Sequence, residues 1–232
     1  MNLAALRYEE LSLNTFPSLR TEVYDGWILR FCEGKSRFDS CVLPLYLSTR
    51  AYEEKIDSCE RKLAAHSLPC IFKMTSNVPS ALDQQLEQRG YALTGKTRVL
   101  ECTRDSFLSN QERRGRKEKQ WPKPDCSRRE NRLELSISKN GTLLGRGLAV
   151  FEEDTAGLYD ISVNREYRRK GMGTAICRAL MEESFRSGAR SIHLQVPASN
   201  LEALSLYHSL GFQEIYLYWY RAKEAAARIR NE

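Results

Sequence analysis

Residues 160–174 read DISVNREYRRKGMGT, and they are the most informative part of the sequence. The residues before the turn, Leu158–Val163, have the composition of a strand. The pattern Arg168-x-x-Gly171-x-Gly173 comes next, and apolar residues at helical spacing follow it directly. The sequence therefore predicts a strand, a glycine turn and a helix in immediate succession.

The glycine turn has the chemistry of an anion-binding site. Glycine accepts dihedral angles that other residues avoid and lets a ligand approach the backbone. The free amides at the start of a helix, together with the positive end of its dipole, attract anions. Arg168, Arg169 and Lys170 add positive charge. The turn predicts a pyrophosphate site, and a tight turn with a solvated basic edge is the alternative that the same residues allow.

A second informative segment, residues 194–212, reads LQVPASNLEALSLYHSLGF. It predicts a strand, a turn that contains Asn200, and a helix that passes Tyr207 and ends at Gly211. The two segments together resemble the GCN5-related N-acetyltransferase (GNAT) superfamily over residues 131–221. The family patterns are R/Q-x-x-G-x-G/A after a strand and A-x-x-L-Y-x-x-x-G-F after an Asn-containing turn.

The resemblance implies an α/β (α+β) GNAT fold, with a mixed, mostly antiparallel central sheet flanked by helices. It also implies acetyl-CoA as co-substrate, with Ile161 and Val163 holding the pantetheine arm through their backbone. Asn200 would contact that arm, and Tyr207 would protonate the departing thiolate. The residues implied to hold the pyrophosphate are Arg168, Arg169, Lys170, Gly171, Met172, Gly173 and Thr174.

The residues suit this chemistry on physical grounds as well. An amine that attacks a thioester needs its partner held close, donors for the developing oxyanion, and a proton for the sulfur. A tyrosine, with an ordinary pKa near 10, is matched to an alkyl thiolate as a general acid. Alternatives remain for both residues, since Tyr207 could be a core aromatic and Asn200 a helix cap.

The base that accepts the proton of the incoming ammonium is less defined. Asp160, Glu152 and Glu153 are candidates, and water or an amine that arrives deprotonated would also serve. Some relatives that acetylate protein N-termini carry a glutamate where this chain has Gln195. The resemblance therefore favours a small-molecule amine over a protein N-terminus as the acceptor.

The first half resembles the accessory lobe of two-lobed GNAT proteins. Leu86-x-x-x-Gly90-Tyr91 aligns with Tyr207-x-x-x-Gly211-Phe212, so that Leu86 stands where the tyrosine acid would be. We expect an accessory, degenerate GNAT-like lobe over residues 1–105 and a basic linker or loop over 106–130. The acetyl-CoA-binding domain is expected over 131–232.

Charge and composition argue against other classes of protein, namely nucleic-acid-binding, disulfide-rich and metal-binding ones. The net charge is +6, and nine cations with four acids between residues 111 and 132 leave +5 there. That segment reads as a solvated linker, with nucleic-acid binding as the less favoured alternative. Seven cysteines without C-x-x-C spacing, and three histidines, argue against a disulfide framework or a metal site.

We expect a cytoplasmic enzyme, because the first residues lack a signal sequence and no apolar run has the length of a membrane span. The leading prediction is an N-acetyltransferase that uses acetyl-CoA and a small-molecule amine in a ternary complex. A non-catalytic acyl-CoA-binding or regulatory module, and a protein or peptide amine acetyltransferase, are the alternatives. Acceptor identity and oligomeric state stay open, a homodimer included.

Overall fold

The structure is a computed structural model that describes residues 2–32, 38–114 and 121–223. It divides into two compact units, one made of the residues up to Thr97 with those from Tyr216 onward, and one made of Arg98–Ile215. Each unit has its own core of buried apolar side chains. The prediction grouped the closing strand with the second half of the chain, whereas most of that strand packs in the first unit.

In the first unit, strands lie in the order β1-β2-β3-β4-β11. All neighbours are antiparallel except β3 and β4, which pair in parallel. Buried apolar side chains of β2, β4, α2 and α3 make the main core. The elements are α1 (Leu3–Thr15), β1 (Arg20–Tyr24), β2 (Trp27–Phe31), β3 (Val42–Pro44), α2 (Tyr52–Ala64), β4 (Ile71–Thr75), α3 (Ser80–Gln88) and β11 (Gln213–Ala222).

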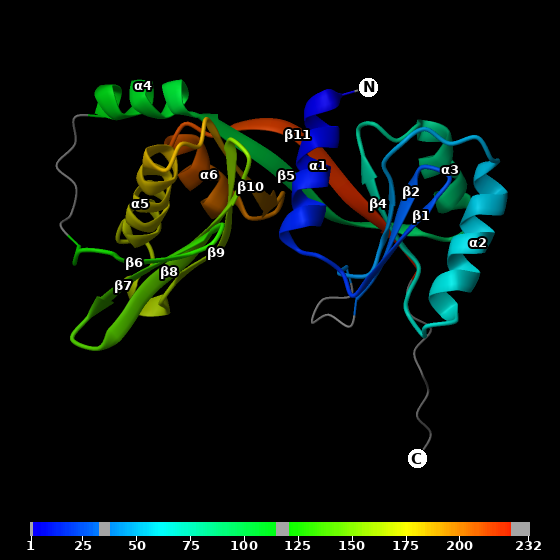
Figure 1. Ribbon diagram of the computed structural model, residues 1–232, viewed down its shortest axis with the longest axis horizontal. Coiled ribbons are helices and arrows are strands. Elements are labelled where there is room, and N and C mark those ends of the chain that lie inside the picture. The colour runs from blue at the N-terminus through cyan, green and yellow to red at the C-terminus, as the bar shows by residue number, and fades with distance from the viewer. Residues whose placement is uncertain (1, 33–37, 115–120, 224–232) are drawn as a thin grey trace, which may run out of the picture. The chain divides into compact units, whose positions relative to one another are not determined.

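The second unit has the strand order β5-β10-β9-β8-β7-β6. Helix α5 packs on one face of β7, β8 and β9, as Figure 1 shows. The elements are β5 (Ala92–Thr103, which begins in the first unit), α4 (Arg104–Arg114), β6 (Asp125–Arg129), β7 (Arg132–Lys139), β8 (Thr142–Glu152), β9 (Thr155–Val163), the 3-10 helix η1 (Arg165–Tyr167), α5 (Met172–Arg186), β10 (Ser191–Pro197) and α6 (Leu201–Ser209).

Two glycines let α5 approach the sheet closely. A Cβ atom on Gly145 would lie 2.5 Å from Cδ1 of Ile176, and one on Gly147 would lie 2.7 Å from Cδ1 of Leu180. Any larger residue at these positions of β8 would force the ends of these two side chains to move. The glycines thus let the side chains of α5 pack directly on the backbone of β8.

Helix ends in both units repeat one backbone pattern. At the end of α3, Tyr91 N donates to Leu86 O (3.0 Å), and Gly90 N donates to a carbonyl oxygen of the last helical turn. At the end of α6, Phe212 N donates to Tyr207 O (3.1 Å). The glycines Gly90 and Gly211 have positive φ in each case, as a Schellman closure requires. The alignment of the two halves predicted from the sequence therefore pairs helix ends of the same geometry.

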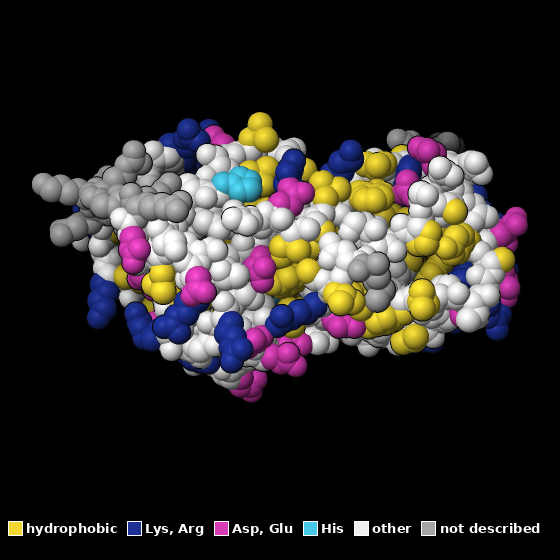
Figure 2. Space-filling model, turned by 90° about the horizontal axis from the view of Figure 1, so that it is seen from above, with side chains coloured by type: hydrophobic (Ala, Val, Ile, Leu, Met, Phe, Trp, Pro, Cys, Tyr) yellow, Lys and Arg dark blue, Asp and Glu magenta, His cyan; other side chains and the backbone are white. Residues whose placement is uncertain are grey.

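The basic segment is more regular than the linker predicted over residues 106–130. Its first part continues α4, and residues 125–129 form β6 against β7. Arg128 lies over the Phe151 ring (4.7 Å to the centroid) and donates to Ser187 Oγ (2.9 Å). Residues 115–120 lie outside the described residues. On the face that Figure 2 shows, Lys and Arg side chains lie among Asp and Glu side chains rather than in one continuous basic surface.

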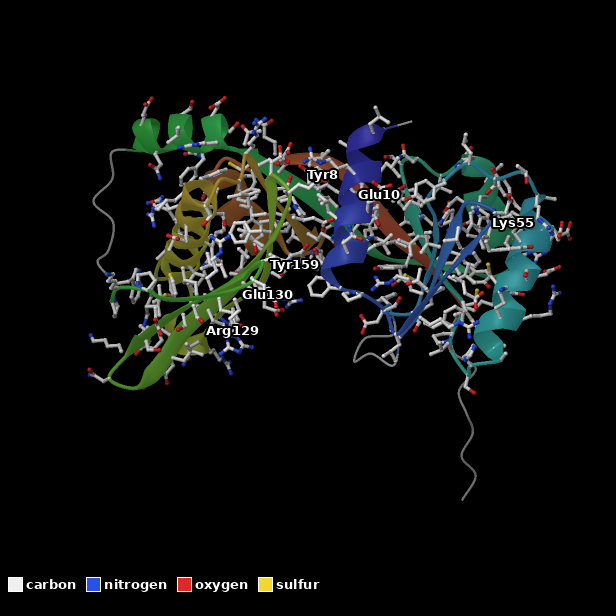
Figure 3. All side chains as sticks on the ribbon, viewed as in Figure 1. Tyr8, Glu10, Lys55, Arg129, Glu130 and Tyr159 are labelled. Atoms are coloured by element: carbon white, nitrogen blue, oxygen red, sulfur yellow. The ribbon has the colours of Figure 1, made fainter. Side chains whose placement is uncertain are left out.

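Lys55 of α2 is a fully buried cation in the first unit (Figure 3). Its Nζ donates to the backbone oxygen of Asp25 (2.5 Å) and to Ser48, and lies 3.1 Å from the Asp25 carboxylate. The same ammonium lies 4.0 Å from the centre of the Trp27 ring. Burial lowers the pKa of Lys55, and Asp25 acts against that shift.

The fold class predicted from the sequence is confirmed: the structure is α+β, with a mixed, mostly antiparallel sheet and flanking helices. The strand, glycine turn and helix predicted around residues 158–174 correspond to β9 and the start of α5, and the helix predicted past Tyr207 corresponds to α6. Helix α1 was not predicted. The Ala- and Arg-rich end of the sequence has the composition of a helix, but it falls mainly on residues 224–232, which lie outside the described residues. No helix in the described part of the chain has the length and apolar character to cross a membrane.

Candidate functional site

Strands β9 and β10 pair along only part of their length and then separate. They pair in parallel from Thr155 opposite Ser191 to Leu158 opposite Leu194, and the register runs no further. Beyond Leu158, β9 continues to Val163 while paired with β8 alone. Over residues 159–163, the edge of β9 that faces away from β8 therefore has no partner strand among the described residues. An extended ligand could add to that edge as a strand would.

A β-bulge lies on this same part of β9. Arg146 of β8 pairs with Ser162 and Leu148 pairs with Tyr159, so Asp160 and Ile161 stand opposite the single residue Gly147. Asp160 has φ +50°, the left-handed conformation that glycine usually supplies at the first position of a G1 bulge. The bulge turns the exposed Asp160 side chain onto the sheet face opposite α5, while Ile161 packs against the core.

The loop after β9 is held by side-chain contacts with the backbone. Asn164 Oδ1 accepts from Glu166 N (3.2 Å) and starts η1, and Arg168 Nε donates to Val163 O (3.1 Å). Arg169 has φ +60° and Gly171 has φ +86°. These two left-handed residues turn the chain sharply, so that the loop leads directly into the first turn of α5.

Helix α5 begins directly after this loop, and no side chain caps its first turn. The amides of its first residues and the positive end of its dipole are therefore available to an anion. A Cβ on Gly171 would meet nothing within 4 Å, whereas one on Gly173 would lie 3.0 Å from Cδ1 of Leu206 in α6. The glycines leave room at the helix start and let α6 approach it.

The cationic side chains of the loop are exposed and make only weak contacts. Arg169 pairs with Glu202 of α6 (3.0 Å), with three-quarters of each side chain exposed. Lys170 Nζ lies 5.7 Å from the centre of the Tyr167 ring. Exposed pairs of this kind contribute about 0–1 kcal/mol and can exchange for a ligand phosphate. Met172 differs from its neighbours because its side chain is buried in the core, so that its backbone amide is what it offers a ligand.

Asn200 caps helix α6. Its Oδ1 accepts from Ala203 N (3.1 Å), and its backbone oxygen accepts from Leu204 N (3.0 Å). The capping alternative is thus present in the structure. The side-chain amide of Asn200 also carries a nitrogen, Nδ2. This residue is exposed, so Nδ2 is able to donate to a ligand.

Tyr207 lies on α6, half-buried against the core of the second unit. Its ring meets Phe212 edge to face, with 5.8 Å between the centroids. Burial raises the pKa of Tyr207 above its ordinary value. Burial also raises the pKa of Cys177 to about 12, so this thiol stays neutral. Tyr207 is therefore a phenol that keeps its proton through neutral and mildly alkaline pH.

Two of the three carboxylates considered as bases are remote. Glu152 pairs with Thr155 at the turn between β8 and β9, and Glu153 lies in that turn. The loop that begins α5 leaves the other end of β9, about 25 Å away at the usual strand rise. Glu152 and Glu153 therefore lie far from that loop, and of the three candidates Asp160 is the one that stands beside the parting of β9 and β10.

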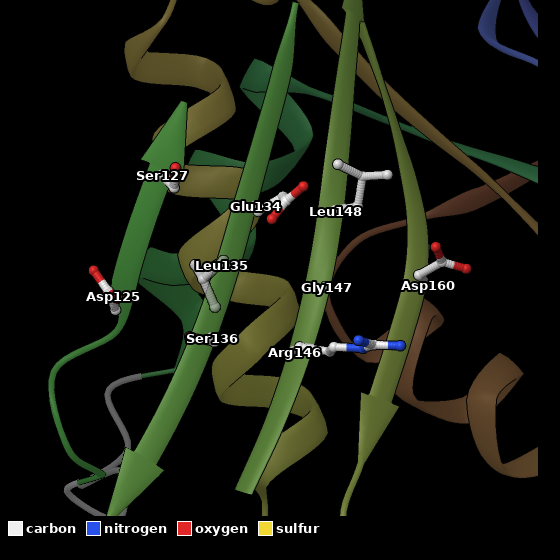
Figure 4. A pocket seen from close by; sticks show the side chains of 9 residues that line it. All are labelled: Asp125, Ser127, Glu134, Leu135, Ser136, Arg146, Gly147, Leu148 and Asp160. Atoms are coloured by element: carbon white, nitrogen blue, oxygen red, sulfur yellow. The ribbon is translucent and has the colours of Figure 1, made fainter. Parts of the chain in front are cut away.

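The structure also brings together residues that sequence reasoning missed. Arg146 and Glu134 line a hollow on the sheet face opposite α5, next to Asp160 (Figure 4). Their common face depends on the register of β7, β8 and β9. The alternation of polar and apolar residues along β7 was the signal available, since it assigns Glu134 to the outer face.

Comparison with known proteins adds independent findings. Residues 97–212, half of the chain, match the family described as Acetyltransferase (GNAT) family. Over 85 residues the chain is 35% identical to the ribosomal protein bS18-alanine N-acetyltransferase of Escherichia coli K12, which covers 37% of this chain and 57% of that enzyme. A 67-residue match, 45% identical, links it to YobR of Bacillus subtilis, an uncharacterized N-acetyltransferase, and covers 29% of this chain and 27% of YobR.

Solved structures match over nearly the whole chain. A GCN5-related N-acetyltransferase from Kribbella flavida superposes with a TM-score of 0.74 at 11% identity, over 97% of this chain and 96% of that one. A tandem GNAT protein from the clavulanic acid biosynthesis pathway gives 0.64 at 11% identity, over 94% and 88%. At such identities these likenesses concern the fold, and they include the first unit as well as the second.

Proposed function

The chain belongs to the GNAT acetyltransferase family, and from this premise we propose that it transfers the acetyl group of acetyl-CoA to a primary amine of a small molecule by direct attack in a ternary complex. The observation that carries the proposal is the end of β9–β10 pairing at Leu158, followed by an uncapped helix start at Gly171. The first feature suits an extended pantetheine arm, and the second suits a pyrophosphate.

The residues fit acetyl-CoA as follows. The backbone of Ile161 and Val163 would bind the pantetheine arm along the free edge of β9. The loop cations with the amides from Gly171 to Thr174 would bind the pyrophosphate, with the Cβ-free glycines leaving space for it. Asn200 would donate to the arm through Nδ2 while its Oδ1 caps α6.

The acceptor amine attacks the acetyl carbonyl carbon, so that a C–N bond forms and the C–S bond breaks. The amine gives up its proton, and the departing sulfur takes one. Tyr207 is proposed to supply that proton, because burial keeps its hydroxyl protonated. Asp160 is proposed to accept the ammonium proton, directly or through water, since it is exposed beside the bulge. Water-mediated transfer keeps the proton balance without further residues.

The acceptor class is the finer part of the proposal. The E. coli relative is named for alanine acetylation of a ribosomal protein, and the match spans 57% of its length. Gln195 stands here where some relatives that acetylate N-termini carry a glutamate. Gln195 accepts no proton as a carboxylate would, which favours a small amine. We also propose a cytoplasmic location on the cysteine pattern, and no nucleic-acid role for the basic segment.

Thiol release from acetyl-CoA in the presence of a panel of primary amines tests the proposal. We expect turnover with small amines and slower turnover with peptide N-termini. Tight acetyl-CoA binding without thiol release for any amine would instead support the alternative, a non-catalytic acyl-CoA-binding or regulatory module. A gel shift that weakens steeply with salt would revive the nucleic-acid alternative.

Replacing Gly171 with Ala is expected to weaken acetyl-CoA binding about tenfold. Its φ of +86° is strained for Ala, and a shifted turn would misdirect the amides that follow it. Gly141→Ala is a matched control, because Gly141 also has positive φ (+77°) and open space around its Cβ position, but lies in the β7–β8 turn. Both variants should lose about 1–2 kcal/mol of stability. Equal acetyl-CoA affinities by calorimetry would contradict the proposed pyrophosphate site.

The pH dependence of turnover follows from the raised pKa of Tyr207. A raised pKa extends the protonated form to higher pH, so the acid stays competent where a solvent-exposed tyrosine would begin to ionise near 10. We expect kcat to show no alkaline decline below about pH 10. A decline with a midpoint near pH 9 that vanishes in Tyr207→Phe would contradict this environment for the acid.

A further inference from the structure

A hollow of about 340 Å³ lies on the outer face of β6, β7, β8 and β9, opposite α5. In Figure 4 the side chains of Glu134, Arg146, Leu148 and Asp160 are grouped around it, with Asp125 and Ser127 on β6 at its far side. Its volume is at the low end of the range for small-molecule sites, about 300–1,000 Å³. It therefore suits a small ligand rather than a folded partner.

The charged side chains of the hollow form no ion pair with one another among the described residues. Arg146 on β8 stands between Glu134 on β7 and Asp160 on β9, and Figure 4 shows its guanidinium extending toward β9 below Asp160. In the same unit Arg169 pairs with Glu202 and Arg186 with Glu183, whereas Arg146 makes no such pair with the carboxylates of the hollow. A cation and carboxylates that line one hollow, and leave one another unpaired, present both signs of charge to a ligand.

Both signs together select the chemistry of the ligand. A pure oligoamine would suit the carboxylates but would be repelled by Arg146, and a pure carboxylate would be repelled by Asp125, Glu134 and Asp160. A zwitterion satisfies both, with its ammonium near a carboxylate and its own carboxylate on the guanidinium. Guanidinium binds carboxylate through two parallel hydrogen bonds, which adds geometric selectivity.

The place of the hollow connects it with the reaction. Asp160 belongs to the hollow and to the bulge of β9, and its neighbour Ile161 is on the edge proposed to hold the pantetheine arm. An ammonium beside Asp160 would approach the thioester from the face opposite α5. The inference therefore rests on the proposed function and makes it more specific.

We propose that this hollow is the acceptor site and that the acceptor is a zwitterion of amino-acid or dipeptide size. Asp160 takes the ammonium end, and Arg146 fixes the acceptor by binding its carboxylate. Arg146 is thus a specificity-determining residue: without it the amine can still enter, but a carboxylate on the acceptor no longer helps.

The test compares acceptors that differ by one charge. Thiol release is measured with acetyl-CoA and a panel of L-amino acids and dipeptides, each beside its C-terminal amide. For the best pairs, kcat/KM should fall about ten- to a hundredfold from acid to amide, the effect of one charge-assisted contact. In Arg146→Gln the acid should drop to the rate of the amide, so that the difference disappears. Arg146→Lys should keep part of it.

The control is Arg132→Gln, which removes an exposed cation from the same sheet without touching the hollow. It should leave the acid-to-amide ratio at the wild-type value. Equal rates for acids and amides in the wild-type protein, with turnover present, would overturn the inference and leave the proposed function standing. A ratio that Arg132→Gln and Arg146→Gln lower equally would overturn it as well. Failure of every amine to release thiol would overturn both.

Discussion

Tyr207→Phe is expected to lower kcat about 10²- to 10³-fold while acetyl-CoA affinity changes by no more than about twofold. The substitution removes one hydroxyl and keeps the ring that packs on Phe212. The sulfur would then leave as a thiolate without an adjacent proton donor. An interaction made only as the C–S bond breaks affects kcat and leaves ground-state binding nearly unchanged.

Tyr46→Phe is the control for loss of a tyrosine hydroxyl. Its hydroxyl donates to Glu10 (2.7 Å) in the first unit, so that its loss should leave kcat unchanged. Calorimetric titration of acetyl-CoA and steady-state thiol release give the two quantities for each variant. A Tyr207→Phe enzyme that loses affinity and kcat in equal measure would mean that Tyr207 shapes the cofactor site without acting as the acid.

Local sequence signals predict the elements that carry the site, whereas the packing around it depends on residues distant in sequence. The β9–α5 turn and the α6 helix are predictable because glycines at Gly171 and Gly211, apolar spacing and Asn200 each act locally. Tyr207 follows from its place in that helix. Its half-buried setting does not, because it depends on how α6 packs against side chains such as Leu180 and Phe212.

Helices α1 and α4 were not predicted, and each was missed for a physical reason. Helix α1 buries Ala5, Tyr8, Leu11 and Thr15, a helical spacing hidden by the polar residues between them. Helix α4 has many charged residues and few apolar ones, so its sequence is typical of a linker. Tertiary contacts decide such segments, since intrinsic helix propensity is a weak guide.

The hollow is harder to predict from the sequence than any single helix or strand. Glu134, Arg146 and Asp160 stand on three strands, and they meet because Arg146 pairs with Ser136 on one side and with Ser162 on the other. The bulge then shifts β9 by one residue and brings Asp160 toward that face. A shift of one residue moves a side chain to the other face of a sheet, so charge patterning along one strand could not predict this grouping.

Lys73→Met is expected to destabilise the protein by about 3–5 kcal/mol. Lys73 on β4 and Glu9 on α1 are both almost fully buried, with Nζ and Oε2 2.6 Å apart. Tyr216 donates to the other carboxylate oxygen (2.9 Å), and the ammonium lies 4.0 Å from the centre of the Tyr218 ring. Removing the ammonium leaves a buried carboxylate with one neutral donor, which is the costly state for an ion pair.

The pH range of this effect follows from the Lys73 pKa. Burial acts to lower it, but the charge and hydrogen bond of Glu9, together with the neighbouring Tyr218 and Cys41, act to raise it, and the pKa is raised. A group with a raised pKa in the folded state contributes stability that is complete below its unfolded pKa, about 10.4 for lysine, and is lost as the pH rises through the folded pKa. The difference between wild type and Lys73→Met should therefore be constant from about pH 7 to 9.5 and narrow at higher pH.

The double variant separates a buried-charge penalty from a packing defect. Glu9→Gln with Lys73→Met keeps an acceptor for Tyr216 and removes both charges, so most of the lost stability should return, to within about 2 kcal/mol of wild type. Arg50→Met is the exposed control, since its partner Glu54 is 2.6 Å away with half of each side chain exposed, and it should lose about 1 kcal/mol or less. Urea unfolding gives each free energy. If the double variant is no more stable than Lys73→Met, the loss comes from packing, and the first unit depends on the shape of Lys73 rather than on its charge.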